Sequence, residues 1–226
     1  MNFHYTDLET CHTATGVVIL IDVLRAFSTA AYAFSRGAKE IILVSTVEEA
    51  LSLKSQIPNS KAMGEVGGLP PEGFDFGNSP TFICQENLSG VTLIQRTGAG
   101  TQGAVRSRNA QIMLASSFVV AKATVQTIAR MGIDQVTFVI TGKWEARGDE
   151  DLACAEYLEA LLQDTRPDTK PFVKRVYESR DALQHLDPAE IAFPQSDLDY
   201  CTQIDRFDFA MPITREGGKL IMRASK

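Results

Sequence analysis

Short apolar runs alternate along this chain with longer stretches in which apolar residues recur at helical spacing. The runs are four or five residues long and rich in Val, Ile and Leu, which is typical of buried strands. They cover residues 17–21, 40–44, 91–95, 112–115 and 136–140. The longer stretches cover residues 24–35, 46–56, 97–107, 118–131 and 150–163. This alternation predicts a mainly parallel sheet with helices packed against it.

The last third of the chain has a different pattern. A helix is predicted over 172–185, and the apolar runs 209–213 and 219–222 flank the turn sequence TREGG, which predicts an antiparallel hairpin. We therefore expect an α/β fold with a largely parallel or mixed sheet, helices on both faces and a C-terminal antiparallel hairpin. The simplest organisation is one domain over residues 1–226, with a division into two lobes near residues 110–135 left open.

Composition narrows the class of protein. The 226 residues are 44% hydrophobic and 22% charged, as in an ordinary soluble globular protein. The net charge of −6 disfavours a nucleic-acid partner, because no basic tract offsets the repulsion of phosphates. The N-terminus lacks the basic-then-apolar pattern of a signal peptide, and no run approaches the ~18 apolar residues of a membrane span. We expect a cytoplasmic protein with neither a membrane nor a nucleic-acid partner.

The cysteines and histidines predict no catalytic set. The four cysteines are far apart in sequence and show neither a disulfide framework nor zinc-type spacing. The three histidines are scattered in polar surroundings and are expected on the surface. These residues are Cys11, Cys84, Cys154, Cys201, His4, His12 and His185.

Two charged residues stand at the joint between the first apolar run and the helix that follows it. Asp22 and Arg25 lie within VVILIDVLRAFSTAAYAF at 17–34, where burial of an unpaired charge costs several kcal/mol. In open parallel sheets, binding sites form at the carboxyl ends of strands, where such joints lie. The alternative is structural, with Asp22 capping its helix and Arg25 pairing with it.

Two more predicted strand ends carry glycines or charges. The first is TGAGTQG after the run at 91–95, where successive glycines before a helix expose backbone amides to an anion. The second is GKWEARGDED after the run at 136–140. All three joints are expected to open on one face of the sheet. The alternatives are an ordinary glycine-rich loop and a solvated acidic first turn. The residues of interest are Arg96, Gly98, Gly100, Thr101, Lys143, Arg147, Asp149 and Asp151.

A long loop is predicted over residues 63–80. Its sequence, MGEVGGLPPEGFDFGNSP, has five glycines and three prolines, so it cannot form a regular element. Long ordered loops in compact domains are usually functional. Glu65 stands among glycines that allow close approach to a ligand, and Asn78 and Ser79 offer neutral hydrogen-bonding groups. The alternative is a floppy surface insertion, but the alternating Phe74 and Phe76 indicate that the loop packs down.

Four blocks in this order carry a resemblance to a known family. IDVLRAFSTA, GEVGGLPPEGFDFGNSP, RTGAGTQGA and GDEDLACAEYL resemble the 2-phosphosulfolactate phosphatase family, over nearly the whole chain from about Val17. The resemblance implies a Mg²⁺-dependent phosphatase that converts 2-phosphosulfolactate to sulfolactate and phosphate, which in methanogens is a step towards coenzyme M. It also implies an α/β fold unrelated to the common phosphatase folds.

Phosphomonoester hydrolysis needs charge neutralisation on the phosphoryl oxygens, and Mg²⁺ prefers oxygen ligands. With the resemblance, we expect Asp22, Glu65 and Arg25 to be catalytic. Asp22 and Glu65 are the preferred metal ligands, with Asp149 or Asp151 as further candidates. The expected substrate-binding residues, which include arginines that can hold oxyanions through a planar fork, are Arg96, Asn78, Ser79, Gly98, Gly100, Thr101, Lys143 and Arg147.

The chain departs from the family pattern at one position, and it leaves alternatives for the substrate, the function and the oligomeric state. Family members often read Thr-Asn-Gly-Thr where this chain has Gly98-Ala99-Gly100-Thr101, so an amide side chain is replaced by Ala99. This change bears on the substrate more than on the reaction class, and phospholactate or phosphoglycolate are alternative substrates. A non-catalytic protein that binds or senses a small anion on the same scaffold is the competing hypothesis. A homodimer is an open alternative to a monomer.

Overall fold

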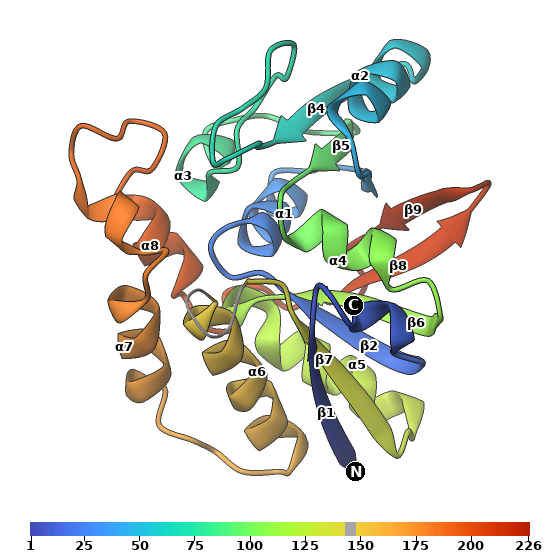
Figure 1. The fold of residues 1–226 in the computed structure, drawn as a ribbon, viewed down its shortest axis with the longest axis vertical. Coiled ribbons are helices and arrows are strands. Elements are labelled where there is room, and N and C mark those ends of the chain that lie inside the picture. The colour runs from blue at the N-terminus through green and yellow to red at the C-terminus, as the bar shows by residue number, and fades with distance from the viewer. Residues whose placement is uncertain (143–147) are drawn as a thin grey trace.

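The computed structural model describes residues 1–142 and 148–226, which form a mixed α/β fold (Figure 1). The strands are β1 (Asn2–Asp7), β2 (Gly16–Ile21), β3 (Glu40–Leu43), β4 (Ser60–Gly64), β5 (Thr92–Arg96), β6 (Ala110–Ser116), β7 (Gln135–Ile140), β8 (Met211–Glu216) and β9 (Lys219–Met222). The α-helices are α1 (Ala26–Ser35), α2 (Val47–Gln56), α3 (Pro80–Ile83), α4 (Gly100–Arg106), α5 (Ala121–Met131), α6 (Asp149–Leu162), α7 (Lys170–Glu178) and α8 (Ser196–Cys201).

All nine strands belong to one sheet, in the order β1-β7-β2-β6-β8-β9-β3-β5-β4. Its two outer groups, β1-β7-β2-β6 and β3-β5-β4, are parallel within themselves. The predicted C-terminal hairpin is confirmed as β8–β9, and it lies between these groups with antiparallel neighbours on both sides. The sheet is therefore mixed, as predicted: two parallel groups of strands are joined by β8 and β9, the last strands of the chain.

The hairpin has a geometric consequence for the strand ends. The steps β6–β8, β8–β9 and β9–β3 are all antiparallel, so the two groups run in opposite directions along the ladder. In a flat sheet their carboxyl ends would lie at opposite edges. Twist of about 20–25° per step, and more in a two-stranded ribbon, accumulates to more than about 100° between β2 and β5. This rotation turns the strand ends of the two groups towards each other.

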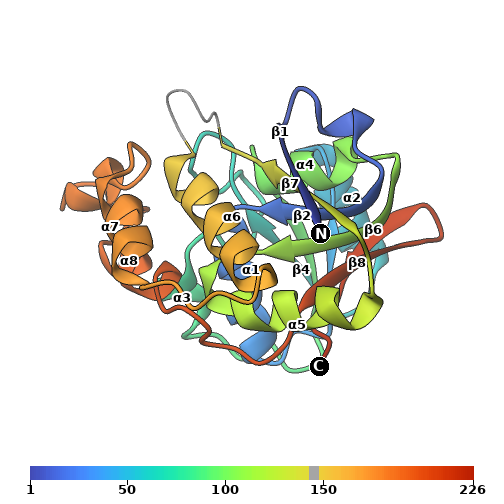
Figure 2. The same ribbon diagram turned by 90° about the horizontal axis from the view of Figure 1, so that it is seen from below.

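Alternate residues of β2 enter two different cores, which is why its sequence is apolar throughout. Val18 and Leu20 belong to a core shared with α1 and α4. Val17, Ile19 and Ile21 belong to a core shared with α5 and α6. Helices therefore cover both faces of the sheet, as expected, and Figure 2 shows α4 and α5 on opposite sides of it. Among the described residues, no helix is both long and apolar enough to cross a bilayer.

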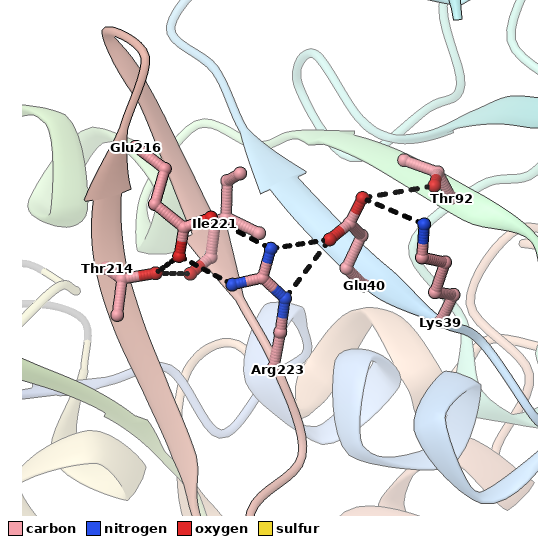
Figure 3. Close-up of polar contacts among 7 residues, drawn as sticks. All are labelled: Lys39, Glu40, Thr92, Thr214, Glu216, Ile221 and Arg223. Atoms are coloured by element: carbon pink, nitrogen blue, oxygen red, sulfur yellow. Dashed lines mark hydrogen bonds and ion pairs between the residues drawn. The ribbon is translucent and has the colours of Figure 1, made fainter.

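An ion-pair cluster ties the hairpin to its neighbour β3 (Figure 3). Arg223, just after β9, donates to Glu40 of β3 at 2.8 Å and to Glu216 of β8 at 2.6 Å. Glu40 is largely shielded from water, whereas the other two side chains are about half exposed. The cluster therefore fixes the inserted hairpin against the parallel group that carries β3 to β5.

Three features differ from the sequence expectations. The edge strands β1 and β4 were not predicted, because edge strands carry few apolar residues; in β1 only the half-buried Phe3 and Tyr5 pack inwards, against Phe138. β4 also takes the first residues of the predicted loop, so the irregular part is 65–79. The helix predicted over 172–185 is wrong in its length. It ends at Glu178, because Ser179 is extended and its hydroxyl accepts the Ala182 amide to begin a new turn.

Candidate active site

A cavity of about 710 Å³ lies where strands from both groups end. One wall includes Asp22 after β2, Glu65 after β4, Gly98 after β5 and Gly142 after β7. A second part of the wall comes from residues 180–193, between α7 and α8. The structure thus brings the three predicted joints and the long loop together. The twist of the sheet, rather than a uniformly parallel order, makes them meet.

Asp22 is 5% exposed and lies at the start of α1. Its Oδ1 accepts the Ala26 amide at 2.8 Å, so the capping alternative is correct as a description of the local contact. Burial raises the pKa of Asp22 to about 6; the Ala26 and Gly100 amides oppose the rise, and the negative charge of Glu65 adds to it. Asp22 and Glu65 are therefore near neighbours electrostatically, although they are far apart in sequence. Two such carboxylates facing one cavity repel each other unless a cation lies between them.

Glu65 is held by the backbone on both sides. One carboxylate oxygen accepts the Gly98 amide and the other accepts the Gly68 amide at 2.8 Å. Its carbonyl accepts Arg96 Nη1 at 2.7 Å. The Gly98 amide, which the sequence assigned to an anionic ligand, is thus donated to Glu65 in this structure. The loop after β4 and the turn after β5 are joined through this one side chain.

Gly100 is required by close packing. A Cβ atom at this position would lie 2.8 Å from Asp22 Oδ2 and 3.0 Å from the Ala26 side chain. Any larger residue would displace the Asp22 carboxylate. Gly100 therefore contributes to the site by letting the first turn of α4 approach Asp22.

Arg25 lines the cavity, but its main partner is not Asp22. Nη1 donates to Asp197 Oδ2 and to the Ala192 carbonyl, both at 2.7 Å. The guanidinium also lies 4.5 Å from the centroid of the Phe193 ring. The alternative in which Arg25 pairs with Asp22 is wrong, because Asp197 of α8 neutralises it. Arg25 fastens the wall at 180–193 to the start of α1.

Asp197 completes this connection and is fully buried. Besides Arg25, it accepts the Ser79 hydroxyl at 2.7 Å and the Thr81 amide at 3.0 Å. Asp197 was not among the residues predicted for the site, because the segment around α8 is polar and weakly periodic. The end of the long loop, α1 and α8 are thus held by one carboxylate.

We expect Asp197→Ala to destabilise the fold by about 3–5 kcal/mol, because it leaves the buried Arg25 charge without its partner. For a chain of this size that corresponds to a fall in Tm of about 6–20 °C. The control is Asp199→Ala on the same helix, whose exposed side chain bonds Tyr177 and no other residue that the structure describes; its Tm should stay within a few degrees of the parent. Thermal unfolding followed by circular dichroism measures both. Equal Tm values for the two variants would contradict the assignment.

Several predicted site residues do not line the cavity. Arg96 donates to the Ser45 and Glu65 carbonyls. Ser79 is bound to Asp197, and Thr101 closes the turn onto Thr97. Asp149 forms an ion pair with Arg175 at 2.6 Å on the surface. Lys143 and Arg147 lie outside the described residues.

Asp151 is buried but does not line the cavity. It accepts the Val23 amide at 2.7 Å and the Gly142 amide at 3.0 Å, so it joins the loops that follow β2 and β7. Burial raises the pKa of Asp151 well above its ordinary value, and the charges of Glu150 and Asp22 raise it further. Burial raises the pKa of Glu150 to about 8, and the negative charge of Asp181 adds to the rise. Glu150 and Asp151 are therefore close enough to Asp22 for their charges to interact with it.

The wall at 180–193 contributes residues that sequence reasoning did not find. Arg180 lines the cavity, and its guanidinium bonds to no residue that the structure describes. His185, expected on the surface, is 2% exposed and lies against Phe193 with its Nδ1 3.1 Å from the Pro194 carbonyl. The polar sequence around both residues resembles an ordinary surface segment, so no local pattern marks them.

Hard oxygen donors in the cavity fit a divalent cation. Asp22 and Glu65 supply carboxylates, and Asn78 Oδ1 is a buried oxygen without a partner among the described residues. Within the described part of the chain, no three His, Cys, Asp or Glu side chains are grouped closely enough to hold a metal ion together. A site here would therefore use one or two carboxylates with water and substrate oxygens, the coordination that Mg²⁺ favours.

Comparison with known proteins identifies the family of this chain. The family model for 2-phosphosulpholactate phosphatase matches residues 3–216. A probable 2-phosphosulfolactate phosphatase from Bacillus subtilis (strain 168) is 36% identical over 88% of this chain and 87% of its own length. Proteins of the same name from Caldicellulosiruptor saccharolyticus and Thermus thermophilus are 31% and 30% identical, over 91% and 88% of this chain and 92% and 88% of theirs. The chain therefore belongs to the 2-phosphosulfolactate phosphatase family.

Proposed function

We propose that this chain hydrolyses 2-phosphosulfolactate, or a similar small phosphorylated 2-hydroxy acid, to the hydroxy acid and inorganic phosphate. Its relatives are named for this activity, and the family model spans both walls of the cavity. The observation that carries the proposal is that Asp22, Glu65 and Arg180 line one cavity, and that the Arg180 guanidinium bonds to no residue that the structure describes. Asp22 and Glu65 would serve a cation and the phosphoryl group, and Arg180 would serve the acidic end of the substrate.

The reaction breaks the bond between phosphorus and the ester oxygen, and a water oxygen bonds to phosphorus. A proton from that water ends on the hydroxyl of the product. Asp22 and Glu65 would hold Mg²⁺, which when bound supplies positive charge at the phosphoryl oxygens. Because backbone amides fix both carboxylates, little reorganisation is needed before the chemical step.

Recognition of the remaining anionic groups falls to Arg180. Asp197 neutralises Arg25, and Arg25 Nη2 also donates to the Gly68 carbonyl at 3.5 Å. Arg25 therefore contributes less positive charge to the cavity than Arg180 does. Arg180 has no such partner among the described residues, and a planar guanidinium fits sulfonate and carboxylate groups. Ala99 also lines the cavity and leaves room where the family often has Asn.

A pair of substrates tests the proposal. 2-Phosphosulfolactate and 2-phospholactate differ by the sulfonate, and phosphate release is measured for both. We expect Arg180→Gln to raise KM for 2-phosphosulfolactate roughly tenfold or more, as for loss of a charged hydrogen bond, and to change KM for 2-phospholactate less. Arg166→Gln, an exposed arginine that does not line the cavity, is the control and should behave like the parent.

Two results would count against different parts of the proposal. Equal effects of Arg180→Gln on both substrates would remove Arg180 from recognition of the sulfonate, while leaving the phosphatase activity in place. Failure to release phosphate from any phosphomonoester, with or without Mg²⁺, would refute the hydrolase. In that case, binding of the same compounds would favour the anion-binding alternative.

A further inference from the structure

A second cavity, of about 450 Å³, lies away from the candidate active site. Its principal lining residues are Tyr32 and Arg36 at the end of α1, Cys84 just after α3, Tyr200 of α8, and Arg206 and Phe207 beyond α8. α1 and α8 both pack against α3, as Figure 1 shows, so three separate segments build the walls. None of the described residues lines both this cavity and the first one.

The charge of the second cavity is opposite to that of the protein. The chain has a net charge of −6, yet the described residues that line this cavity include two arginines and no carboxylate. Arg36 uses Nε to donate to the Glu86 carbonyl at 2.9 Å, which leaves its terminal nitrogens available. Arg206 makes no side-chain hydrogen bond or ion pair with the described residues. Two guanidinium groups that pair with no described carboxylate, beside one hollow, are suited to an anion.

The floor of the second cavity is aromatic and fixed. The Tyr32 ring packs edge-on against Tyr200 and Phe207, with centroids 5.0 and 4.9 Å apart. Its hydroxyl donates to the Tyr200 carbonyl at 3.0 Å, so the ring cannot turn freely. Such a floor offers an apolar surface against which a flat group can stack.

Cys84 shows that both charges act inside this hollow. Burial raises the pKa of its thiol and the charge of Asp197 adds to the rise, while the positive charges of Arg36 and Arg206 oppose it. The other three cysteines are buried, and Cys84 alone among the four is partly exposed. Its thiol therefore reports on whether the second cavity is occupied.

We propose that the second cavity is a binding site for a small molecule with a sulfonate, phosphate or carboxylate group on a flat apolar body. The anionic group would lie between Arg36 and Arg206, and the flat body would rest on the partly exposed rings of Tyr200 and Phe207, which the buried Tyr32 ring supports. The site is separate from phosphoester hydrolysis and does not depend on the function proposed above.

Alkylation of Cys84 by iodoacetamide, followed by mass spectrometry of the intact chain, tests this inference. The probe is naphthalene-2-sulfonate, and the uncharged naphthalene-2-sulfonamide is its matched control. At ten times its dissociation constant, the sulfonate should slow alkylation about tenfold by mass action. The sulfonamide should not.

Arginine variants test whether the protection of Cys84 comes from binding in the second cavity. Arg206→Gln and Arg36→Gln should each abolish protection, and Arg130→Gln, an exposed arginine of α5, should retain it. The inference fails if the sulfonate gives no protection, if the sulfonamide protects equally, or if both arginine variants are still protected. It also fails if, without the probe, alkylation of Cys84 slows as the protein concentration rises. In that case a second copy of the chain would cover the cavity.

Discussion

Asp22→Asn should lower the turnover rate at least about a hundredfold, the scale of losing one key electrostatic group in an active site. The fold should survive, because an asparagine oxygen can still accept the Ala26 amide that Asp22 accepts at 2.8 Å. The substitution therefore removes the charge of Asp22 and keeps its hydrogen bond to the start of α1. Phosphate release shows the effect of the lost charge, and thermal unfolding shows whether the hydrogen bond still stabilises the helix.

The matched control for Asp22 is Asp149→Asn. Both acids stand at the start of a helix that follows a strand, but Asp149 pairs with Arg175 on the surface and does not line the cavity. Its activity should stay within about twofold of the parent, as for surface sites. A folded Asp22→Asn protein with more than half of the parent activity would restore the purely structural interpretation of Asp22. Equal losses in both variants would place the cation at α6 instead.

Exhaustive chelation should abolish activity, and added Mg²⁺ should restore it. The reason is electrostatic: Asp22 and Glu65 face one cavity together with a multiply charged substrate, and the negative charge of Glu65 raises the pKa of Asp22. A cation between them removes the repulsion among the acids and the phosphoryl oxygens. Glu65→Gln should therefore raise the Mg²⁺ concentration for half-maximal rate.

The control for Glu65 lies in the same loop. Glu72 is exposed and does not line the cavity, so Glu72→Gln should leave the Mg²⁺ dependence unchanged. Limited proteolysis adds a readout besides activity: the loop at 65–80 should be cut more slowly with Mg²⁺ and product present. Activity that survives chelation, or an unchanged Mg²⁺ dependence in Glu65→Gln, would show that these carboxylates do not hold the metal.

Local features of this protein could be predicted from its sequence. β2 is apolar at every position because both of its faces are buried, and the joint after it must carry Asp22 at the start of α1. The same reasoning located the turn before α4 and the hairpin β8–β9. Each prediction depends on residues within a few positions of one another, and such short-range patterns are legible in one sequence.

Contacts between distant segments could not be predicted in this way. The partner of Arg25 is Asp197, 172 positions away, and the sequence offered the nearby Asp22 instead. Arg180 and His185 lie in a polar stretch that has the pattern of an ordinary surface. Thr101, Arg96 and Ser79 have the right chemistry for a ligand, yet the structure turns them to backbone groups and to Asp197.

The sequence by itself determined the α/β class, the helices on both faces and the acids and glycines at the strand ends, because burial and capping are local demands. Only the tertiary structure decided that these ends meet. The hairpin inserts between two parallel groups and reverses their relative direction. The cavity exists because the accumulated twist of the strands brings the groups back together. That twist is a property of the whole sheet, and no single segment encodes it.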